Sequence, residues 1–253
     1  MPLIKDLVIA VLQAFGYSIN IKTKKRLLAD LLASPKESSL SAARAKRVLK
    51  ASKSQLGQDV LALMSAGVEK PGFFVEFGAA NGVSLSNSYL LEKEFGWKGI
   101  IAEPGRQWHK KLKENRTCEI EFRCVYSTTG EKLSFSENYL GELSGLTKHS
   151  GNSETGVLNR TTSSYEVETI SLIDLLDSKN APKHIDFLSV DTEGSEFAIL
   201  NAFDFSKYTF GAISVEHNYT DSRQKVHDLL TSKGYRQVYP ELSDFDDWFA
   251  LAN

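Results

Sequence analysis

The sequence predicts a Rossmann-like α/β fold, with a mostly parallel sheet covered by helices on both faces, and two observations support this prediction. From residue 73 onward, short apolar runs alternate with segments of helical periodicity, as in repeated βαβ units. Near the end of the chain, "YRQVYP" and "DDWFAL" are separated only by a short acidic turn, so we expect them to pair as an antiparallel hairpin.

The expected elements follow one another from residue 54. In the first half we expect a capped helix over 54–67, a strand over 73–78, a helix over 84–95, a strand over 99–104, a helix over 105–115 and a strand over 120–127. In the second half we expect helices over 171–178, 194–202 and 222–233 and strands over 184–191 and 210–218. Residues 137–163 are rich in Gly, Ser, Thr and Asn and show no period, so they predict a long loop, which is usually functional or disordered.

Charge divides the chain into two parts. Residues 1–53 carry 11 Lys and Arg against 3 Asp and Glu, a balance of +8, whereas the remaining 200 residues carry 19 against 29, a balance of −10. We therefore predict a basic helical extension over 1–53 and a main domain over 54–253. The extension lacks the interleaved aromatic residues of a nucleic-acid platform, so we expect no nucleic-acid partner. A solvated basic face, or peripheral contact with a membrane or another partner, fits it better.

Cysteine content and the N-terminus predict a cytoplasmic location. Cys118 and Cys124 fit no metal-binding spacing and are too few for a disulfide framework, which favours a reducing compartment. The apolar run over 7–15 has no small-residue cleavage site and is too short to span a bilayer. Peripheral attachment at the inner face of the membrane, through the basic extension, is compatible with both observations.

The stretch "FFVEFGAANGVS" (73–84) leads from a strand that carries one acid, Glu76, into a turn of small residues. Such a turn allows a ligand to approach the backbone closely, at the edge of the sheet where α/β proteins bind nucleotides. The spacing from Gly78 to Gly82 is not that of a dinucleotide fingerprint, and Glu76 would repel a pyrophosphate but could accept from an ammonium group. Glu103, which ends the next strand, can accept hydrogen bonds from both hydroxyls of a ribose. Together these residues suit S-adenosylmethionine.

Several blocks also resemble one known family. "SQLGQD", "VEFGAANG", "GIIAEP", "HIDFLSVDTEGSE" and the terminal hairpin are similar, in order and spacing, to the FkbM family of S-adenosylmethionine-dependent methyltransferases. That family modifies hydroxyl groups of sugars and polyketides. The resemblance covers residues 54 to 251 and implies a class I methyltransferase fold, with seven strands and the last one inserted antiparallel. It implies as acceptor a sugar in a glycan, which could be lipid-linked, or in a secondary metabolite.

The resemblance also implies which residues bind the cofactor. The methionine part would contact Glu76, Gly78, Asn81 and Gly82, and the ribose would contact Glu103. Gln55 and Asp59 belong to a motif that would close over the cofactor. Cys124 and Val125 would lie at the adenine. Asp191, at the end of the fourth strand, faces the same crevice.

A sugar hydroxyl is a weak nucleophile, so methyl transfer to it needs a base or a metal ion. Asp191 ends one strand, and Glu216 and His217 end the next, so we expect these side chains to converge. They could hold Mg²⁺ or Mn²⁺; Asp191 or His217 could act as a base without a metal; or Asp191 could merely cap the following helix.

Two other functions remain compatible with the residues. One is an NAD-dependent oxidoreductase on a Rossmann-like sheet, which the glycine spacing disfavours. The other is a non-catalytic module that binds a nucleotide-like ligand in glycan assembly, which would have a filled crevice but no reactive cluster. Binding of S-adenosylmethionine against NAD separates the first alternative from a methyltransferase, and methyl transfer to glycans separates the second.

Overall fold

The computed structural model describes residues 21–33, 41–138, 144–147 and 161–252. At its centre lies a seven-stranded sheet of order β10-β11-β9-β8-β1-β2-β3. Its strands are β1 (Phe73–Phe77), β2 (Lys98–Ala102), β3 (Glu119–Glu121), β8 (His184–Val190), β9 (Thr209–Glu216), β10 (Tyr235–Gln237) and β11 (Asp246–Leu251). The pairs from β9 to β3 are parallel, and β11 runs antiparallel between β9 and β10. The predicted fold class, including the terminal hairpin, is confirmed.

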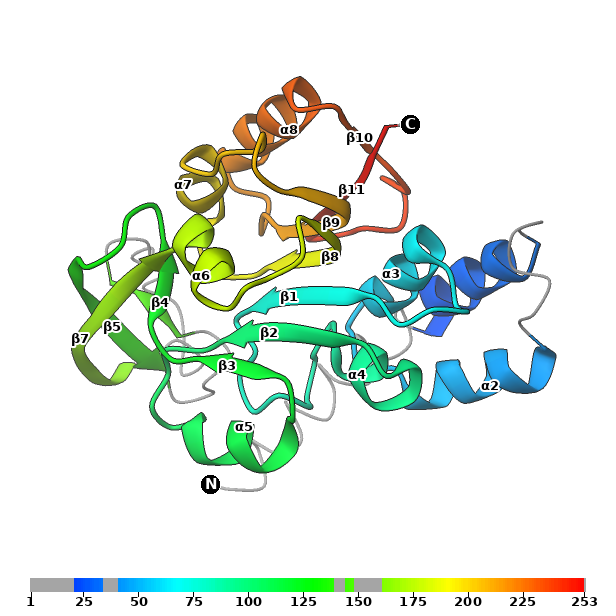
Figure 1. Ribbon diagram of the computed structural model, residues 1–253, viewed down its shortest axis with the longest axis horizontal. Helices are drawn as coiled ribbons and strands as arrows, with labels where there is room; N and C mark the ends of the chain where they lie inside the picture. Colours follow the sequence, from blue (N-terminus) through cyan, green and yellow to red (C-terminus); the bar gives the residue numbers. More distant parts are fainter. Residues whose placement is uncertain (1–20, 34–40, 139–143, 148–160, 253) are drawn as a thin grey trace.

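Helices cover both faces of this sheet because successive strand residues point to opposite sides (Figure 1). On one face, Val75 and Phe77 pack with α6 (Leu172–Ser178), α7 (Glu196–Asn201) and α8 (Ser222–Ser232). On the other, Phe74 packs with α2 (Ala42–Ala51), α3 (Gln58–Ala66), α4 (Tyr89–Phe95) and α5 (His109–Asn115). The result is a three-layer sandwich whose binding edge lies at the carboxyl ends of the strands.

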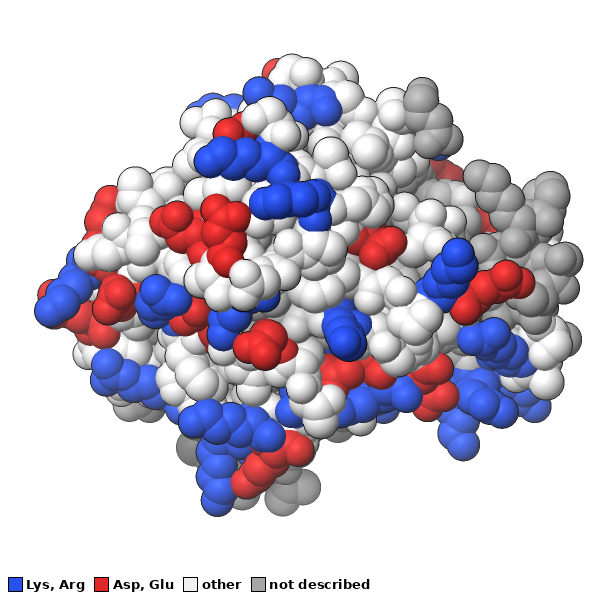
Figure 2. Space-filling view, in the orientation of Figure 1, with Lys and Arg blue, Asp and Glu red and all other residues white. Residues whose placement is uncertain are grey.

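The described part of the basic extension is helical and packs against the sheet. Residues 21–33 bury Leu27, Leu28 and Leu31 in the same core as Phe74. Figure 2 shows Lys and Arg side chains gathered over α2, whose outer face is basic. The boundary at residue 53 stays a prediction, and residues 1–20 and 34–40 lie outside the described part. Within the described residues, no helix is long and apolar enough to cross a membrane.

A second sheet was not predicted. The expected strand over 120–127 is in fact divided between β3 and β4 (Cys124–Tyr126), and β4 belongs to a four-stranded sheet of order β4-β7-β5-β6. Its other strands are β5 (Lys132–Asn138), β6 (Gly145–Leu146) and β7 (Thr161–Ser171). The described ends of the expected 137–163 loop are therefore strands, whereas 139–143 and 148–160 lie outside the described residues. In Figure 1 this sheet stands beyond the carboxyl ends of β1, β2 and β3.

Three expected helices begin four or five residues later than predicted. The helix expected from 84 begins at Tyr89, because Ser86 and the backbone N–H of Asn87 are hydrogen-bonded to the Glu76 carboxylate. The helix expected over 54–67 begins at Gln58, after the left-handed Gly57. The third, α5, begins four residues after its expected start.

Candidate active site

A cavity that is partly open to solvent lies between the carboxyl edge of the main sheet and the second sheet; its empty space, adjoining open solvent included, is about 400 Å³. It is lined by Phe77, Gly78, Ala102, Glu103, Pro104, Cys124, Val125, Phe135, Ser144, Gly145, Leu146, Asp191 and Thr192. Among these described lining residues two are acids and none is Lys or Arg. The cavity therefore favours a ligand that carries positive charge and disfavours a pyrophosphate.

Gly78 allows the two central strands to approach each other at the cavity floor. Its φ is +73°, and a Cβ built there would lie 2.1 Å from the carbonyl oxygen of Asp191. Its N–H donates to the carbonyl of Ala102 at 3.1 Å. Any side chain at this position would push β1 and β8 apart, so the glycine shapes the site without donating a functional group.

Glu103 is a buried carboxylate held by backbone amides. One oxygen accepts from the N–H of Ala80 at 2.8 Å, and the other accepts from the N–H of Gly105 at 2.7 Å. Burial raises the pKa of Glu103 to about 7, against the opposing effect of these two hydrogen bonds. Each oxygen keeps a lone pair, so the side chain can still accept hydrogen bonds from a diol in the cavity.

The apolar side of the cavity comes from both sheets. Cys124 and Val125, which were predicted to lie at an adenine, line it together with Phe135 and Leu146 of the second sheet. Phe135, Leu146 and Cys124 form a small core of their own. A flat aromatic base would find apolar surface here, next to the acid that can hold a ribose.

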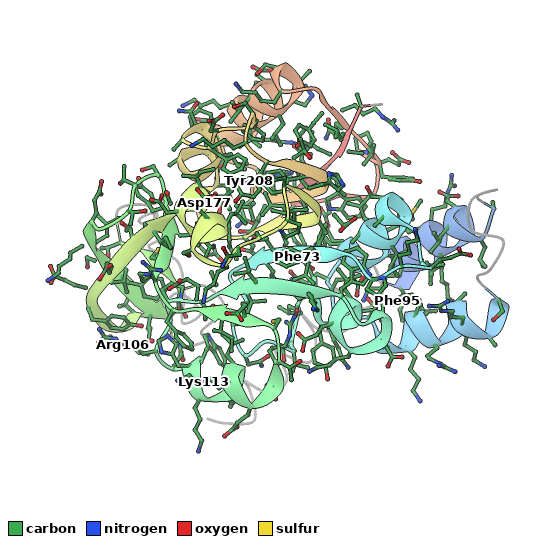
Figure 3. The ribbon with its side chains drawn as sticks, in the orientation of Figure 1. Phe73, Phe95, Arg106, Lys113, Asp177 and Tyr208 are labelled. Carbon is green, nitrogen blue, oxygen red and sulfur yellow. The ribbon has the colours of Figure 1, made fainter. Side chains whose placement is uncertain are left out.

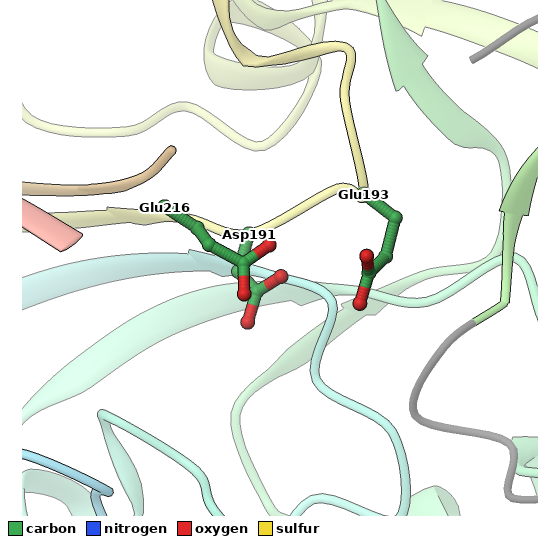
Figure 4. A group of neighbouring side chains, drawn as sticks. All are labelled: Asp191, Glu193 and Glu216. Atoms are coloured by element: carbon green, nitrogen blue, oxygen red, sulfur yellow. The ribbon is translucent and has the colours of Figure 1, made fainter. Parts of the chain in front are cut away.

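Three carboxyl groups meet at the inner end of this cavity. Asp191, Glu193 and Glu216 each offer an oxygen, and these oxygens lie within 4.8 Å of one another. Figure 4 shows Asp191 and Glu216 side by side, with Glu193 reaching into the same space from the loop after β8. Asp191 belongs to both features, because it lines the cavity and forms part of this carboxylate cluster.

The carboxylate cluster holds protons unusually tightly. Burial, and then the charges of Glu216 and Glu193, raise the pKa of Asp191 well above its ordinary value. Burial first, and neighbouring carboxylates second, raise the pKa of Glu216 to about 8 and that of Glu193 to about 7. Asp191 and Glu216 also share a hydrogen bond. Near neutral pH the cluster therefore retains protons that isolated carboxylates would have lost.

A turn and a polar layer support the cluster. Glu193 has a φ of +56°, and Glu196 stabilises its loop by accepting from the N–H groups of Thr192 and Gly194, both at 2.9 Å. Asp246 accepts from Ser214 at 2.8 Å and from Gln58 at 2.7 Å. Glu193 was not predicted as a site residue.

The structure does not bring His217 into the cluster. Its Nδ1 accepts from the N–H of Tyr219 at 2.9 Å, so its Nε2 carries the hydrogen and donates to the carbonyl of Asp246 at 3.0 Å. Burial lowers its pKa. With both ring nitrogens occupied, His217 is a poor metal ligand and a poor base, and Glu193 takes the place predicted for it.

Glu76 lies behind the cavity wall. Its carboxylate accepts from Ser86 at 2.9 Å, from the N–H of Asn87 at 2.6 Å and from Ser88, and it lies 3.7 Å from Arg116. These internal partners occupy the acid that was predicted to accept from the ammonium group of the ligand.

The other predicted cofactor residues also lie outside the lining. Asn81 accepts from the N–H groups of Val83 and Ser84, both at 2.8 Å, and so caps the turn. Gly82 leaves room for Arg116, whose Cγ would lie 2.7 Å from a Cβ. Asp59 is fully buried and accepts from Ser54 at 2.6 Å; Gln55 is half-buried. Their roles toward the cofactor stay predictions.

A network that joins the loop after Glu103 to the second sheet was also missed. The guanidinium of Arg106, a residue labelled in Figure 3, stacks on the ring of Tyr165, with its Cζ 3.9 Å from the ring centroid. The backbone N–H of Arg106 donates to the Tyr165 hydroxyl at 2.9 Å. Tyr165 donates to Glu137 at 2.6 Å, and Glu137 accepts from the N–H of Gln107 at 3.1 Å. The network joins a loop to strands that are distant in the sequence, so no local pattern in the sequence could have indicated it.

The parallel sheet, the antiparallel β11 and the acid-lined cavity at the carboxyl edge define the class: an α/β protein with the class I methyltransferase fold. The chain belongs to the FkbM methyltransferases, because residues 76–249 match the methyltransferase FkbM domain. It is therefore a methyltransferase, and membership of this family implies S-adenosylmethionine as the methyl donor.

Several solved structures are similar to the chain, and two of them are methyltransferases. One is the precorrin-6y C5,15-methyltransferase of Geobacter metallireducens GS-15, at 12% identity and a TM-score of 0.42, with 75% of this chain and 76% of that chain covered. The other is methyltransferase FkbM of Methylobacillus flagellatus KT, at 14% identity and a TM-score of 0.43, with 93% of this chain and 60% of that chain covered. No curated protein matches the chain at a significant level.

Proposed function

We propose that the protein transfers a methyl group from S-adenosylmethionine to a hydroxyl group of a sugar, in a glycan or a secondary metabolite. The observation that supports this most directly is the position of Asp191, which belongs both to the cavity and to the carboxylate cluster. Such an arrangement puts proton-accepting chemistry next to the bound donor. S-adenosylmethionine, when bound, supplies a methyl group activated by a positively charged sulfur.

The residues that line the cavity suit this cofactor in charge and in polarity. Glu103 would accept from the ribose hydroxyls, and Val125, Phe135 and Leu146 would pack against the adenine. Among the described residues, the lining holds two acids and no Lys or Arg, which suits the positive charges of a sulfonium and an ammonium group. The same charge pattern disfavours the pyrophosphate of NAD, so it argues against the oxidoreductase alternative.

The carboxylate cluster is the proposed means of activating the hydroxyl. Asp191, Glu193 and Glu216 would hold Mg²⁺ or Mn²⁺, since three carboxylate oxygens form a hard ligand set. A divalent cation there would lower the pKa of a nearby hydroxyl. Holding the three acids together also costs less when a cation neutralises them. With Glu193 in place of His217, the ligand set contains oxygen alone.

Methyl transfer and metal binding test the proposal together. We expect the protein to bind S-adenosylmethionine but not NAD in calorimetry, and to transfer labelled methyl groups to glycan acceptors. Turnover should vanish in a chelator and return with Mg²⁺ or Mn²⁺. Asp191→Asn and Glu216→Gln should each lower the rate roughly 10²- to 10⁴-fold. Cofactor affinity should stay nearly unchanged in Glu216→Gln, because Glu216 is not among the residues that line the cavity. Asp228→Asn, at an exposed carboxylate of α8, is the matched control.

The same assays identify the alternatives. Unchanged turnover in chelator, with a large loss in only one of the two variants, would point to a side-chain base without a metal. Glu193→Gln should weaken Mn²⁺ binding, whereas His217→Gln should not. Binding of S-adenosylmethionine with no methyl transfer to any glycan would favour a non-catalytic binding module.

A further inference from the structure

Tyr219 stands out on the loop after β9. Its relative exposure is 67%, against 43% for Leu85 and 41% for Leu32, the other exposed large hydrophobic residues of the described part. Its φ is +57° and that of the preceding Asn218 is +42°, conformations that side-chain-bearing residues rarely adopt. Such strain is kept only where the surrounding structure imposes it, and it concentrates at functional sites.

Three contacts hold this exposed ring in place. The N–H of Tyr219 donates to His217 at 2.9 Å, and the two rings form an edge-to-face contact with centroids 5.3 Å apart. The hydroxyl of Tyr219 donates to the carboxylate of Asp244. The loop itself is tied to the β10–β11 turn, where the N–H of His217 donates to the carbonyl of Phe245 at 2.9 Å. The side chain is thus presented to solvent and pre-oriented, which lowers the entropic cost of binding.

Tyr219 is also near the carboxylate cluster along the chain. It follows Glu216 by three residues, so their Cα atoms are at most about 11 Å apart, which is the span of one or two sugar rings. Exposed Asp244, beside the Tyr219 hydroxyl, can accept further hydrogen bonds from a polyol. A sugar can pack its C–H groups on an aromatic face and donate hydrogen bonds from its hydroxyls to a carboxylate, so this pair of side chains suits a sugar. The neighbouring acids Asp244 and Glu216 would repel a sugar phosphate.

We propose that Tyr219 is the platform on which an uncharged sugar ring of the acceptor stacks, and that His217 and Asp244 are positioning residues that hold it. This inference rests on the proposed function and names where its acceptor binds. It also explains why His217 is buried and fully hydrogen-bonded at a strand end next to the cluster: it fixes the platform instead of reacting.

Binding and turnover can be measured separately. The probes are methyl glucoside, methyl galactoside and methyl rhamnoside, titrated into protein with ¹³C-labelled tyrosine in the presence of S-adenosylhomocysteine. The Tyr219 signal is assigned by its loss in Tyr219→Phe. We expect at least one glycoside to shift this signal. In Tyr219→Ala the apparent Kd or KM for that glycoside should rise about tenfold, which corresponds to about 1.4 kcal/mol.

Affinity for S-adenosylmethionine should stay the same in every variant. Tyr219→Phe, which keeps the ring, should stay within a few-fold of wild type, and Leu32→Ala, which removes an exposed apolar side chain on another element, should change nothing. Alanine keeps a Cβ, so the strain at this position is similar. A positioning role for His217 predicts that His217→Gln raises KM for the acceptor more than it lowers kcat.

Three results would each overturn the platform. The first is that no glycoside moves the Tyr219 signal, and the second is that Tyr219→Ala binds and methylates glycosides as wild type does. The third is that Tyr219→Ala changes the oligomeric state in sedimentation and leaves the KM for the glycoside unaltered. Failure of the proposed function looks different. A glycoside would then still shift the Tyr219 signal in a protein that methylates none of the probes, and the platform would stand.

Discussion

Glu103 should release a proton when the cofactor binds. In the free protein Glu103 as a whole is 6% exposed, and burial raises the pKa of its carboxyl group to about 7 against two opposing amide hydrogen bonds. Ribose hydroxyls donate hydrogen bonds to the ionised form, and a sulfonium in the same cavity also favours it. At pH 6.5, a group with a pKa of about 7 is roughly three-quarters protonated, so complete ionisation would release about 0.8 proton per cofactor.

The same group makes folding stability depend on pH, with a definite sign. The pKa of Glu103 is higher in the folded chain, about 7, than its ordinary value of 4.5, so between these pH values only the folded state keeps the proton. The contribution of Glu103 to the free energy of unfolding is fully present below pH 4.5 and is lost as the pH rises through about 7. The gap corresponds to about 3 kcal/mol of unfolding free energy.

Glu103→Gln isolates both effects. Calorimetry at pH 6.5 in two buffers of different ionisation enthalpy gives the number of protons released on binding. Urea unfolding at pH 5 and pH 8 gives the change in unfolding free energy between these two pH values. We expect the variant to release fewer protons than wild type, to lose most of this change, and to bind S-adenosylmethionine about 1 to 3 kcal/mol more weakly. Glu119→Gln, at an exposed carboxylate of β3, is the control. Equal proton release in wild type and Glu103→Gln would refute the assignment.

Two substitutions test the scaffold of the site. Gly78→Ala should cost about 3 kcal/mol of unfolding free energy in urea, because its Cβ would lie 2.1 Å from the Asp191 carbonyl at a φ of +73°; a loss below about 1 kcal/mol would show that β1 and β8 can separate freely. Arg116→Met should cost about 3 to 5 kcal/mol, because it leaves Glu76 buried without its cation and Glu92 paired with Lys93 alone; unchanged thermal stability would contradict that pairing.

The main sheet was predictable from sequence because its signals are local. Strands buried on both faces, such as β8 and β9, appear as continuous apolar runs, and the absence of a helix between β10 and β11 indicates a hairpin. The second sheet was not predictable in the same way. In β7 the exposed positions are filled by Ser, Thr and Glu, so its alternation resembles a polar loop. β3 and β4 are separated only by Phe122 and Arg123, where the chain passes from one sheet to the other.

The site residues divide along the same line. Glu103, Asp191 and Glu216 were predictable because a strand end fixes where a carboxylate lies. Glu193 was missed because its place depends on backbone conformation: a φ of +56°, followed by Gly194 at +111°, puts its carboxyl group within reach of Asp191. The Glu-Gly pair in "DTEGSE" was the available clue, since glycine permits such a turn. His217 was misplaced because its sequence position beside Glu216 says nothing of hydrogen bonds made to Tyr219 and β11.

Two groups of buried acids in this fold are treated differently, and the contrast bears on function. Glu76 and Glu92 lie within 3.7 Å and 2.6 Å of the fully buried guanidinium of Arg116, so the chain supplies its own cation there. Asp191, Glu193 and Glu216 are partly buried and form no ion pair with any Lys, Arg or His of the described residues. Held this way, they raise one another's pKa and oppose folding at neutral pH. This contrast supports the proposal that the second group binds a positive charge that arrives with a ligand.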